Sequence, residues 1–150
     1  MKPSPVFDYH EEVKAFVERG LWDGRRRFDH CTTIGFATAQ EGLVAGVVYH
    51  NYEPDNGVIE LSAYSSRRDR ADKHIVSLIF GQYPFLQLGC RLLVARHSEH
   101  NLRARRIWAA LGANEHPIPE LRGPGEAEII ATLRRDVFLN SKFMRGNPDG

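Results

Sequence analysis

Two spacings of apolar residues alternate along the chain and predict helices and strands in turn. Apolar residues that recur every three to four positions predict helices over residues 8–19, 72–82 and 102–111. Short apolar runs that are rich in β-branched residues predict strands over residues 32–39, 43–51, 58–64, 91–96 and 128–133. The strand–helix–strand order in the middle implies one parallel pair inside a mostly antiparallel sheet.

Glycine and proline mark the ends of several predicted elements. Gly42 closes a short hairpin turn and residues 53–57 (EPDNG) form a second turn, so we expect the first three strands to form an antiparallel meander. Pro84 should interrupt the second helix. Pro117 and Pro119 allow an edge strand or extended segment at best. These elements together predict an α/β protein of the α+β kind.

Residues 91–113 form the most informative stretch, RLLVARHSEHNLRARRIWAALGA. The apolar run gives way to a polar turn at residues 97–100 and then to Asn101, whose side chain suits the start of a helix. Gly112 follows the last periodic residue, as expected of a glycine that ends a helix. The apolar face of this helix consists of Ala104, Ile107, Trp108 and Leu111.

This pattern resembles the last strand–helix unit of the GNAT superfamily, the acetyl-CoA-dependent N-acyltransferases. That superfamily commonly places Asn after the strand, Ala three residues on, Tyr seven on, and Leu-Gly-Phe at ten to twelve. The same spacing here gives Asn101, Ala104, Trp108, Leu111, Gly112 and Ala113. Trp108 replaces the usual Tyr, which commonly protonates the leaving thiolate, and Ala113 replaces the usual Phe.

The resemblance implies a fold for nearly the whole chain. We expect a GNAT-like sheet with helices on both faces over residues 8–133, within a single domain of residues 1–150 that ends in a tail of residues 134–150. The segment YPF-x-QLGCR at residues 83–91 looks most like small members encoded by phages and prophages.

Composition and charge limit the class of protein. The chain has 150 residues, of which 42% are hydrophobic and 26% charged, as in one soluble globular domain. No apolar run approaches the ~20 residues that span a bilayer and no signal peptide is evident, so we expect a cytoplasmic protein with no membrane partner. A net charge of +1 argues against a general nucleic-acid surface, although 16 Arg against 4 Lys form local clusters.

The resemblance places acetyl-CoA between two splayed parallel strands, here residues 58–64 and 91–96, with its pyrophosphate on the loop of residues 67–71. That loop usually contains glycine, and its absence here leaves two alternatives. Arginine side chains hold the phosphates, or cofactor binding is weak or lost. The residues expected to bind the cofactor are Leu61, Ser62, Ala63, Arg67, Arg68, Asp69, Arg70, Ala71, Asn101, Arg103 and Arg106.

Acetylation of an amine needs a base for the ammonium, donors that polarise the thioester carbonyl, and an acid for the thiolate. Glu60 alternates with its apolar strand neighbours, and some GNAT enzymes use a Glu on this strand, or a water that it holds, as the base. The resemblance therefore makes Glu60 the first candidate base, and His97, at the end of the adjacent strand, is the second. Carbonyl polarisation would come from a backbone N–H on the same strand as Glu60. Because Trp108 cannot act as the acid, either Tyr64 or Tyr83 replaces it or the thiolate leaves without a protein acid.

Three functions are compatible with these residues. The first is direct transfer of acetyl from acetyl-CoA to an amine acceptor, either a small molecule or a protein. The second is a catalytically silent module for binding or phage–host interaction, and the third is modification of nucleic acid. The sparse set of His97, His100 and Cys90 does not predict a metal site. A homodimer is compatible with the exposed edge strands of such folds.

Overall fold

The computed structural model describes residues 2–68 and 71–145. Its contacts divide the chain into two compact units. The first unit comprises Met1–Tyr52 and Glu60–Ile75, and the second comprises Glu53–Ile59 and Val76–Gly150. Each unit buries apolar side chains of its own, such as Val17 and Val48 in the first and Phe85 and Phe138 in the second.

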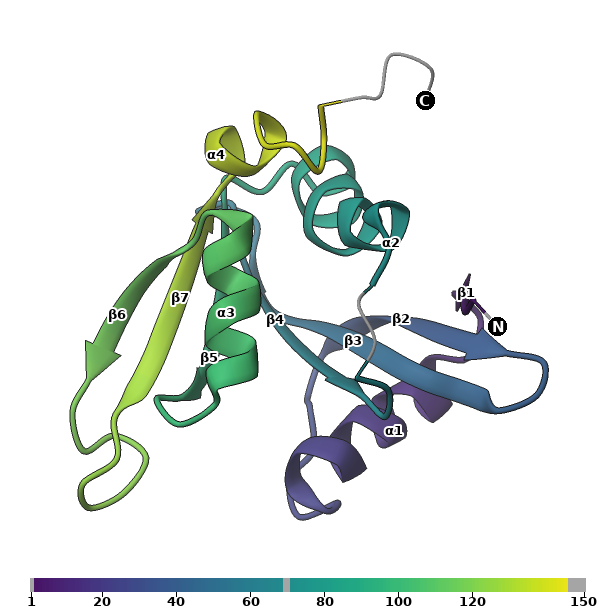
Figure 1. Cartoon of the computed structure of the whole chain (residues 1–150), viewed down its shortest axis with the longest axis horizontal. Coiled ribbons are helices and arrows are strands. Elements are labelled where there is room, and N and C mark those ends of the chain that lie inside the picture. The colour runs from purple at the N-terminus through teal and green to yellow at the C-terminus, as the bar shows by residue number, and fades with distance from the viewer. Residues whose placement is uncertain (1, 69–70, 146–150) are drawn as a thin grey trace. The chain divides into compact units, whose positions relative to one another are not determined.

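The first unit places helix α1 (His10–Trp22) against antiparallel strands (Figure 1). Its other elements are β1 (Ser4–Val6), β2 (Cys31–Thr38), β3 (Gly42–Glu53), most of β4 (Val58–Ser65) and the start of α2 (Lys73–Ser77). Two glycines allow the helix to approach closely. A Cβ atom on Gly35 would lie 2.6 Å from Val13 Cγ2, and one on Gly46 would lie 2.7 Å from Val17 Cγ2.

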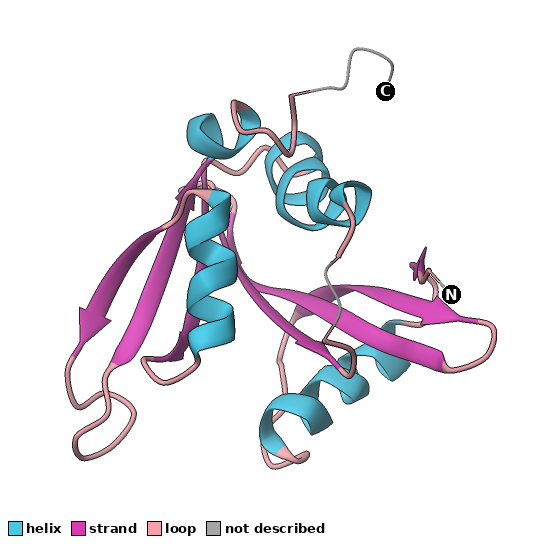
Figure 2. Cartoon of the chain, viewed as in Figure 1, coloured by secondary structure: helices cyan, strands magenta, loops and turns pink. Residues whose placement is uncertain are grey.

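The second unit combines three antiparallel strands with helices (Figure 2). Its elements are η1 (Leu78–Gln87), β5 (Leu92–Ser98), α3 (Leu102–Leu111), β6 (Asn114–Ile118), β7 (Glu128–Arg134) and α4 (Arg135–Leu139). β7 pairs with β5 on one side and with β6 on the other. Trp108 of α3 is buried edge-on against Phe80 of η1, with ring centroids 5.2 Å apart.

The predicted α/β class is confirmed. The strands form one seven-stranded, mostly antiparallel sheet in the order β1-β2-β3-β4-β5-β7-β6. The one parallel pair is β4 with β5, and it begins where the N–H groups of Arg91 and Leu92 donate to the carbonyl of Gly57. The meander, the crossover and the edge position of β6 match the sequence-based expectation.

Several element ends were predicted wrongly. Helix α1 does not stop at Gly20 but runs to Trp22 and ends at Asp23, which adopts a left-handed conformation with φ 54°. Gly20 instead makes room for a ring, because a Cβ atom there would lie 2.2 Å from Tyr64 Cγ. β5 continues through His97 and Ser98, which were predicted to form a turn.

Pro84 does not interrupt the second helix. After the short α2, residues Leu78–Gln87 form a π-helix that contains Pro84. Proline lacks an N–H and clashes with the preceding turn of an α-helix. The wider turn accommodates it, and the N–H of Leu88 donates to the carbonyl of Tyr83 five residues back.

Candidate functional site

A polar cluster on β3 and β4 surrounds Glu60, the first candidate base. Glu60 Oε1 accepts a hydrogen bond of 2.9 Å from Asn51 Nδ2, and its Oε2 lies 3.7 Å from His50 Nε2. His50 Nε2 also lies 2.9 Å from Ser62 Oγ. The side chains of His50 and Glu60 are only about 14% and 15% exposed. The carboxylate is therefore oriented by two neighbours and still reachable.

Aromatic side chains border this cluster within the first unit. The ring of Phe28 lies 4.9 Å from the His50 ring and 4.8 Å from Trp22. The Arg26 guanidinium lies over the Trp22 ring at 4.9 Å, a cation–π contact. Trp22 packs against the core of Val17, Phe28 and Val48. Packing is thus the demonstrated role of Trp22, and Phe28 is the aromatic residue that contacts the polar cluster.

Glu18 fixes the connection that carries these aromatic residues. Its buried carboxylate accepts 2.9 Å hydrogen bonds from the backbone N–H of Phe28 and from Lys14 Nζ. Burial acts to raise the pKa of Glu18, but the hydrogen bonds from Lys14 and Phe28 outweigh it and hold the pKa below its ordinary value. The connection after α1 is therefore anchored to the helix by a charged group.

His50 is held in its neutral form by its surroundings. Burial lowers its pKa below the ordinary value, and the adjacent Glu60 carboxylate acts in the opposite direction. At neutral pH the imidazole is therefore uncharged and able to accept a proton.

The loop after β4 is tied to the first unit by its own side chains. The Arg67 guanidinium pairs with Glu41 at 2.5 Å, and Ser65 Oγ bonds to both the N–H and the carbonyl of Arg67. Asp72 Oδ1 accepts a 2.9 Å hydrogen bond from the N–H of Ile75, and Asp72 Oδ2 lies 2.8 Å from Lys2 Nζ. The Lys2 hydrogen bond, supported by the Ile75 N–H, holds the pKa of Asp72 below its ordinary value.

These contacts bear on the predicted phosphate loop. The carboxylate of Asp72 takes the N–H at the helix start that an anionic ligand would otherwise use, and Arg67 already faces a carboxylate. Arg68 and Ala71 are exposed. Asp69 and Arg70, also predicted to bind the cofactor, lie outside the described residues. Leu61 is buried, whereas Ser62 joins the Glu60 cluster and Ala63 is exposed.

The second candidate base, His97, lies in the second unit near the end of β5. It is 7% exposed, and its Nε2 has no hydrogen-bond partner among the residues that the structure describes. Burial lowers the pKa of His97. The carboxylates of Glu115 and Glu128 oppose that effect, and Arg105 and Arg122 assist it. An orphaned buried nitrogen of this kind carries a desolvation cost.

The start of α3 is capped as predicted. Asn101 Oδ1 accepts 3.1 Å from the N–H of Ala104, and Gly112 ends the helix with φ 101°. Arg103 and Arg106 are exposed on the helix surface. Sequence reasoning missed Arg105, which donates 2.9 Å hydrogen bonds to both carboxylate oxygens of Glu115. The helical spacing gave no reason to expect that Arg105, and not Arg103 or Arg106, forms this ion pair.

Sequence reasoning also missed His50 and Asn51. Both lie on the strand before the 53–57 turn, and Glu60 lies on the strand after it. The turn at residues 53–57 was predicted from the sequence. Pairing the two strands across that turn would have placed His50 and Asn51 near Glu60. Trp108, which replaces the family Tyr, is 6% exposed and part of the core, as predicted.

Two further searches concern metals and membranes. Within residues 2–68 and 71–145, no three His, Cys, Asp or Glu side chains converge in a way that could hold a metal ion. None of the helices in that part of the chain is both long and apolar enough to cross a bilayer.

Comparison with known proteins relates the fold to acetyltransferases. No family model and no curated protein sequence matches the chain. The chain is similar in structure to spermidine N-acetyltransferase from Vibrio cholerae in a dodecameric intermediate state, with a TM-score of 0.73, 10% identity, and coverage of 93% of this chain and 97% of that chain. The chain is also similar to spermidine/spermine N-acetyltransferase from the same organism in complex with manganese ions. The TM-score is 0.72 and the identity 10%, and the match covers 93% of this chain and 96% of that chain.

A third similar structure is described as an acetyltransferase. It has a TM-score of 0.59 and 15% identity, and the match covers 72% of this chain but 61% of that one, less than two thirds of its length. The fold is that of GNAT-like acetyltransferases. At these identities the likeness establishes the fold alone.

Proposed function

We propose that the protein is an N-acyltransferase that moves an acetyl group from acetyl-CoA directly to an amine acceptor. The observation that supports this most is the Glu60 cluster, in which a carboxylate is oriented by Asn51 at 2.9 Å and by His50 at 3.7 Å. The fold supports the same reaction class. The Phe28 ring beside His50 suits an acceptor whose amine is carried on an apolar stem.

Glu60 is the base in this proposal. An alkyl ammonium must lose a proton before its nitrogen lone pair can attack, and the carboxylate takes that proton directly or through one water. Asn51 holds one carboxylate oxygen, and the other, which lies 3.7 Å from His50 Nε2, is proposed to face the ammonium. His50 is held neutral by burial, and its Nε2 lies 2.9 Å from Ser62 Oγ.

Of the two alternatives expected from the sequence, phosphate binding by arginine side chains and weak or lost binding, the proposal takes the first. When bound, acetyl-CoA would supply the acetyl group as a thioester. Backbone binding of its pyrophosphate at the start of α2 does not fit, because Asp72 accepts from the N–H of Ile75. Binding by exposed arginine side chains fits, and the described residues proposed for it are Arg68, Arg103 and Arg106, together with Asn101.

The remaining roles follow from the same strands and helix. A backbone N–H within residues 61–63 is proposed to polarise the carbonyl. His97 is the alternative base or a proton donor, since no residue within 2–68 and 71–145 hydrogen-bonds its Nε2. Trp108 takes no part, because its ring is buried against Phe80.

The test is an acetyl-transfer assay with spermidine and with a lysine-containing peptide as acceptors. We expect transfer by the native chain and about a 100-fold lower kcat for Glu60→Gln, the usual size of a general-base effect. Acetyl-CoA binding should be unchanged in that variant. Glu53→Gln, an exposed carboxylate in the neighbouring turn, is the matched control and should keep full activity. Equal turnover in both variants would remove Glu60 from the proposal.

A second candidate function is an interaction module of GNAT fold, of the phage–host kind suggested by the segment at residues 83–91. The contacts of Asp72 and Arg67 favour it, because they occupy the groups expected to hold phosphate. If acetyl-CoA does not bind, the protein is this interaction module and not an acetyltransferase. In either case we propose a cytoplasmic protein, with a small-molecule or protein partner and with homodimer formation open to test. Nucleic-acid modification has only the local arginine clusters in its favour.

A further inference from the structure

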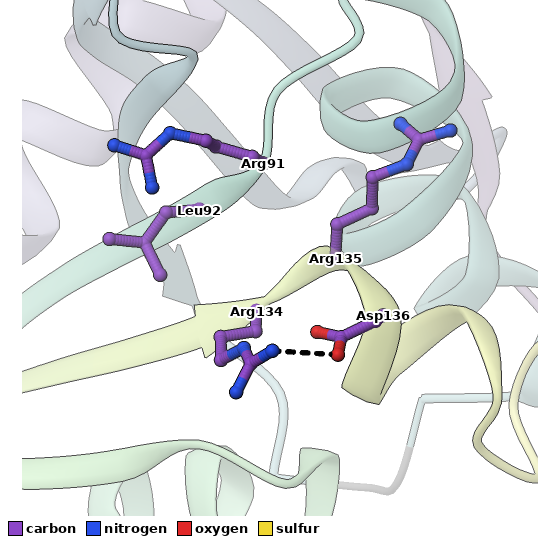
Figure 3. Close-up of a pocket in the computed structure, with 5 residues that line it drawn as sticks. All are labelled: Arg91, Leu92, Arg134, Arg135 and Asp136. Carbon is purple, nitrogen blue, oxygen red and sulfur yellow. Dashed lines mark hydrogen bonds and ion pairs between the residues drawn. The ribbon is translucent and has the colours of Figure 1, made fainter.

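A cavity of about 460 Å³ opens in the second unit where β5 begins and β7 ends. Its lining residues are Arg91, Leu92, Arg134, Arg135 and Asp136 (Figure 3). Three positive charges thus line one cavity together with one negative charge. No residue of this cavity belongs to the site proposed for acetyl transfer.

Two of the three arginines are anchored by neutral groups. Arg91 Nε donates a 2.7 Å hydrogen bond to the carbonyl of Asn56, and Arg135 Nη1 donates to the carbonyl of Phe85. Arg134 pairs with the carboxylate of Asp136 at 2.8 Å, where both side chains are about 60% exposed. An exposed pair of this kind is weak and readily exchanged for another anion.

The strands fix the geometry of the two arginines that face the opening. Leu92 and Arg134 are directly paired across β5 and β7, and the N–H of Arg135 donates 3.0 Å to the carbonyl of Arg91. Figure 3 shows Arg91 and Leu92 extending to one side, Arg134 turned toward Asp136, and Arg135 pointing away from the other two arginines. Because the Arg134–Asp136 pair is exposed and Arg135 is bonded to the Phe85 carbonyl, Arg91 and Arg134 are the candidates for direct contact with a ligand, and Arg135 adds charge nearby.

We propose that this cavity binds a small molecule through a phosphate or pyrophosphate group. A guanidinium presents a planar fork of donors that matches phosphate oxygens, and charge-assisted hydrogen bonds of this type are the strong ones. Leu92 between the two arginines offers a surface for an apolar part of the same ligand. The multiple negative charge of a phosphate group matches the excess positive charge of the lining.

This site is separate from the one proposed for the acyl donor. His97 and Asn101 lie at or beyond the other end of β5, and a strand of seven residues is roughly 20 Å long at about 3.3 Å per residue. The inference therefore does not depend on the proposed function. A protein that fails to transfer acetyl groups would still bind phosphate here.

The test is calorimetric titration of the full chain with inorganic pyrophosphate at low ionic strength. We expect saturable one-site binding that weakens about tenfold in Arg91→Gln and in Arg134→Gln, the effect of losing one charge-assisted contact. Arg25→Gln, an exposed arginine of the first unit, is the control for unspecific charge and should bind as the native chain does. Loss of binding in Arg68→Gln with none in Arg91→Gln would place the anion on the loop after β4 and overturn the proposal.

Asp136→Asn is expected to raise the affinity for pyrophosphate, a change that misfolding would not produce. Removing the carboxylate frees Arg134 from its ion pair, so pyrophosphate should bind several-fold more tightly. Unchanged or weaker binding in folded Asp136→Asn would contradict the site. Citrate that binds as tightly as pyrophosphate would overturn the assignment to phosphate.

Discussion

At the scale of single residues, His50 and Glu60 act on one another through charge. The carboxylate favours the protonated imidazole, while burial disfavours it more strongly. Glu60→Gln removes the favourable part, so the pKa of His50 should fall further below its ordinary value of about 6.5. NMR titration of the imidazole resonances measures this. His97, in the second unit, serves as the internal control and should keep its titration midpoint. A rise or no change at His50 would show that the two side chains are not coupled.

His97 predicts how stability depends on pH. Since burial lowers the pKa of His97, the unfolded chain binds a proton more readily than the folded one. Its contribution to stability is therefore complete above about pH 6.5 and is lost as the pH falls through the lowered pKa. The free energy of unfolding in urea should drop between pH 7 and pH 5, and His97→Leu should flatten that drop.

The same variant separates a structural from a chemical role for His97. Removing an orphaned polar atom from the interior is expected to be neutral or stabilising at pH 7. If His97 also moves a proton in catalysis, turnover falls in His97→Leu although the fold is intact. A variant that is destabilised at pH 7 and equally acid-sensitive would contradict both expectations.

Individual site residues were predictable only where the pattern of apolar and polar residues concerns a single strand or helix. Glu60 was identified because it breaks the apolar pattern of its own strand. The partners that orient it, His50 and Asn51, come from the other side of a hairpin, and Asn51 adopts a positive φ of 49° that no propensity indicates. The pairing of Arg67 with Glu41 likewise joins residues 26 positions apart.

At the scale of elements, the caps of α3 were predictable because they are local chemistry. Asn101→Ala removes the acceptor for the N–H of Ala104 and should lower the free energy of unfolding by about 1 kcal/mol. Denaturation in urea measures this loss. Asn101→Asp keeps an acceptor and should retain that stability, because a carboxylate at a helix start is also favoured by the helix dipole.

The pair of variants also tests whether Asn101 has a second role. If its side chain contacts the pantetheine or a phosphate of the donor, Asn101→Asp should weaken acetyl-CoA binding while leaving stability intact. Equal affinity in the native chain and Asn101→Asp would restrict Asn101 to capping.

Other elements could not be derived from local patterns. β1 is three residues, SPV, with a proline at its centre, and it exists because β2 offers it a partner. The π-helix of η1 depends on tertiary packing around Gly81, where a Cβ atom would lie 2.8 Å from Phe138 and 2.6 Å from Met144. Contacts with segments that are distant in the sequence decide such structure, and periodicity does not report them.

At the scale of the whole molecule, fold and function are supported by different residues. The antiparallel meander and the crossover were predicted from the order of elements, whereas the places of β1 and β7 in the sheet were not. The fold is similar to that of an acetyltransferase with 10% identity. The residues that would distinguish a catalyst from an interaction module lie in one loop, where Asp72 and Arg67 contact the chain itself. Affinity for the donor is therefore the property that divides the two functions.

That affinity is measurable as a shift in thermal unfolding. A ligand that binds only the folded chain at a hundred times its Kd adds about 2.7 kcal/mol of stability. For a chain of this size that corresponds to roughly 5–10 °C in the unfolding midpoint. We expect acetyl-CoA to produce such a shift, and Arg68→Gln and Arg106→Gln each to reduce it, because their exposed guanidiniums are proposed to hold the phosphates.

Arg25→Gln removes the same charge from a different surface and should leave the shift unchanged. Arg91→Gln is a second comparison, since its cavity lies at the opposite end of β5 from Asn101. A shift that depends on Arg91 but not on Arg68 would mean that the phosphates of the donor occupy that cavity instead. If millimolar acetyl-CoA produces no shift in the unfolding midpoint, the protein is an interaction module of this fold and not an acetyltransferase. A thioester that does not bind cannot be a substrate.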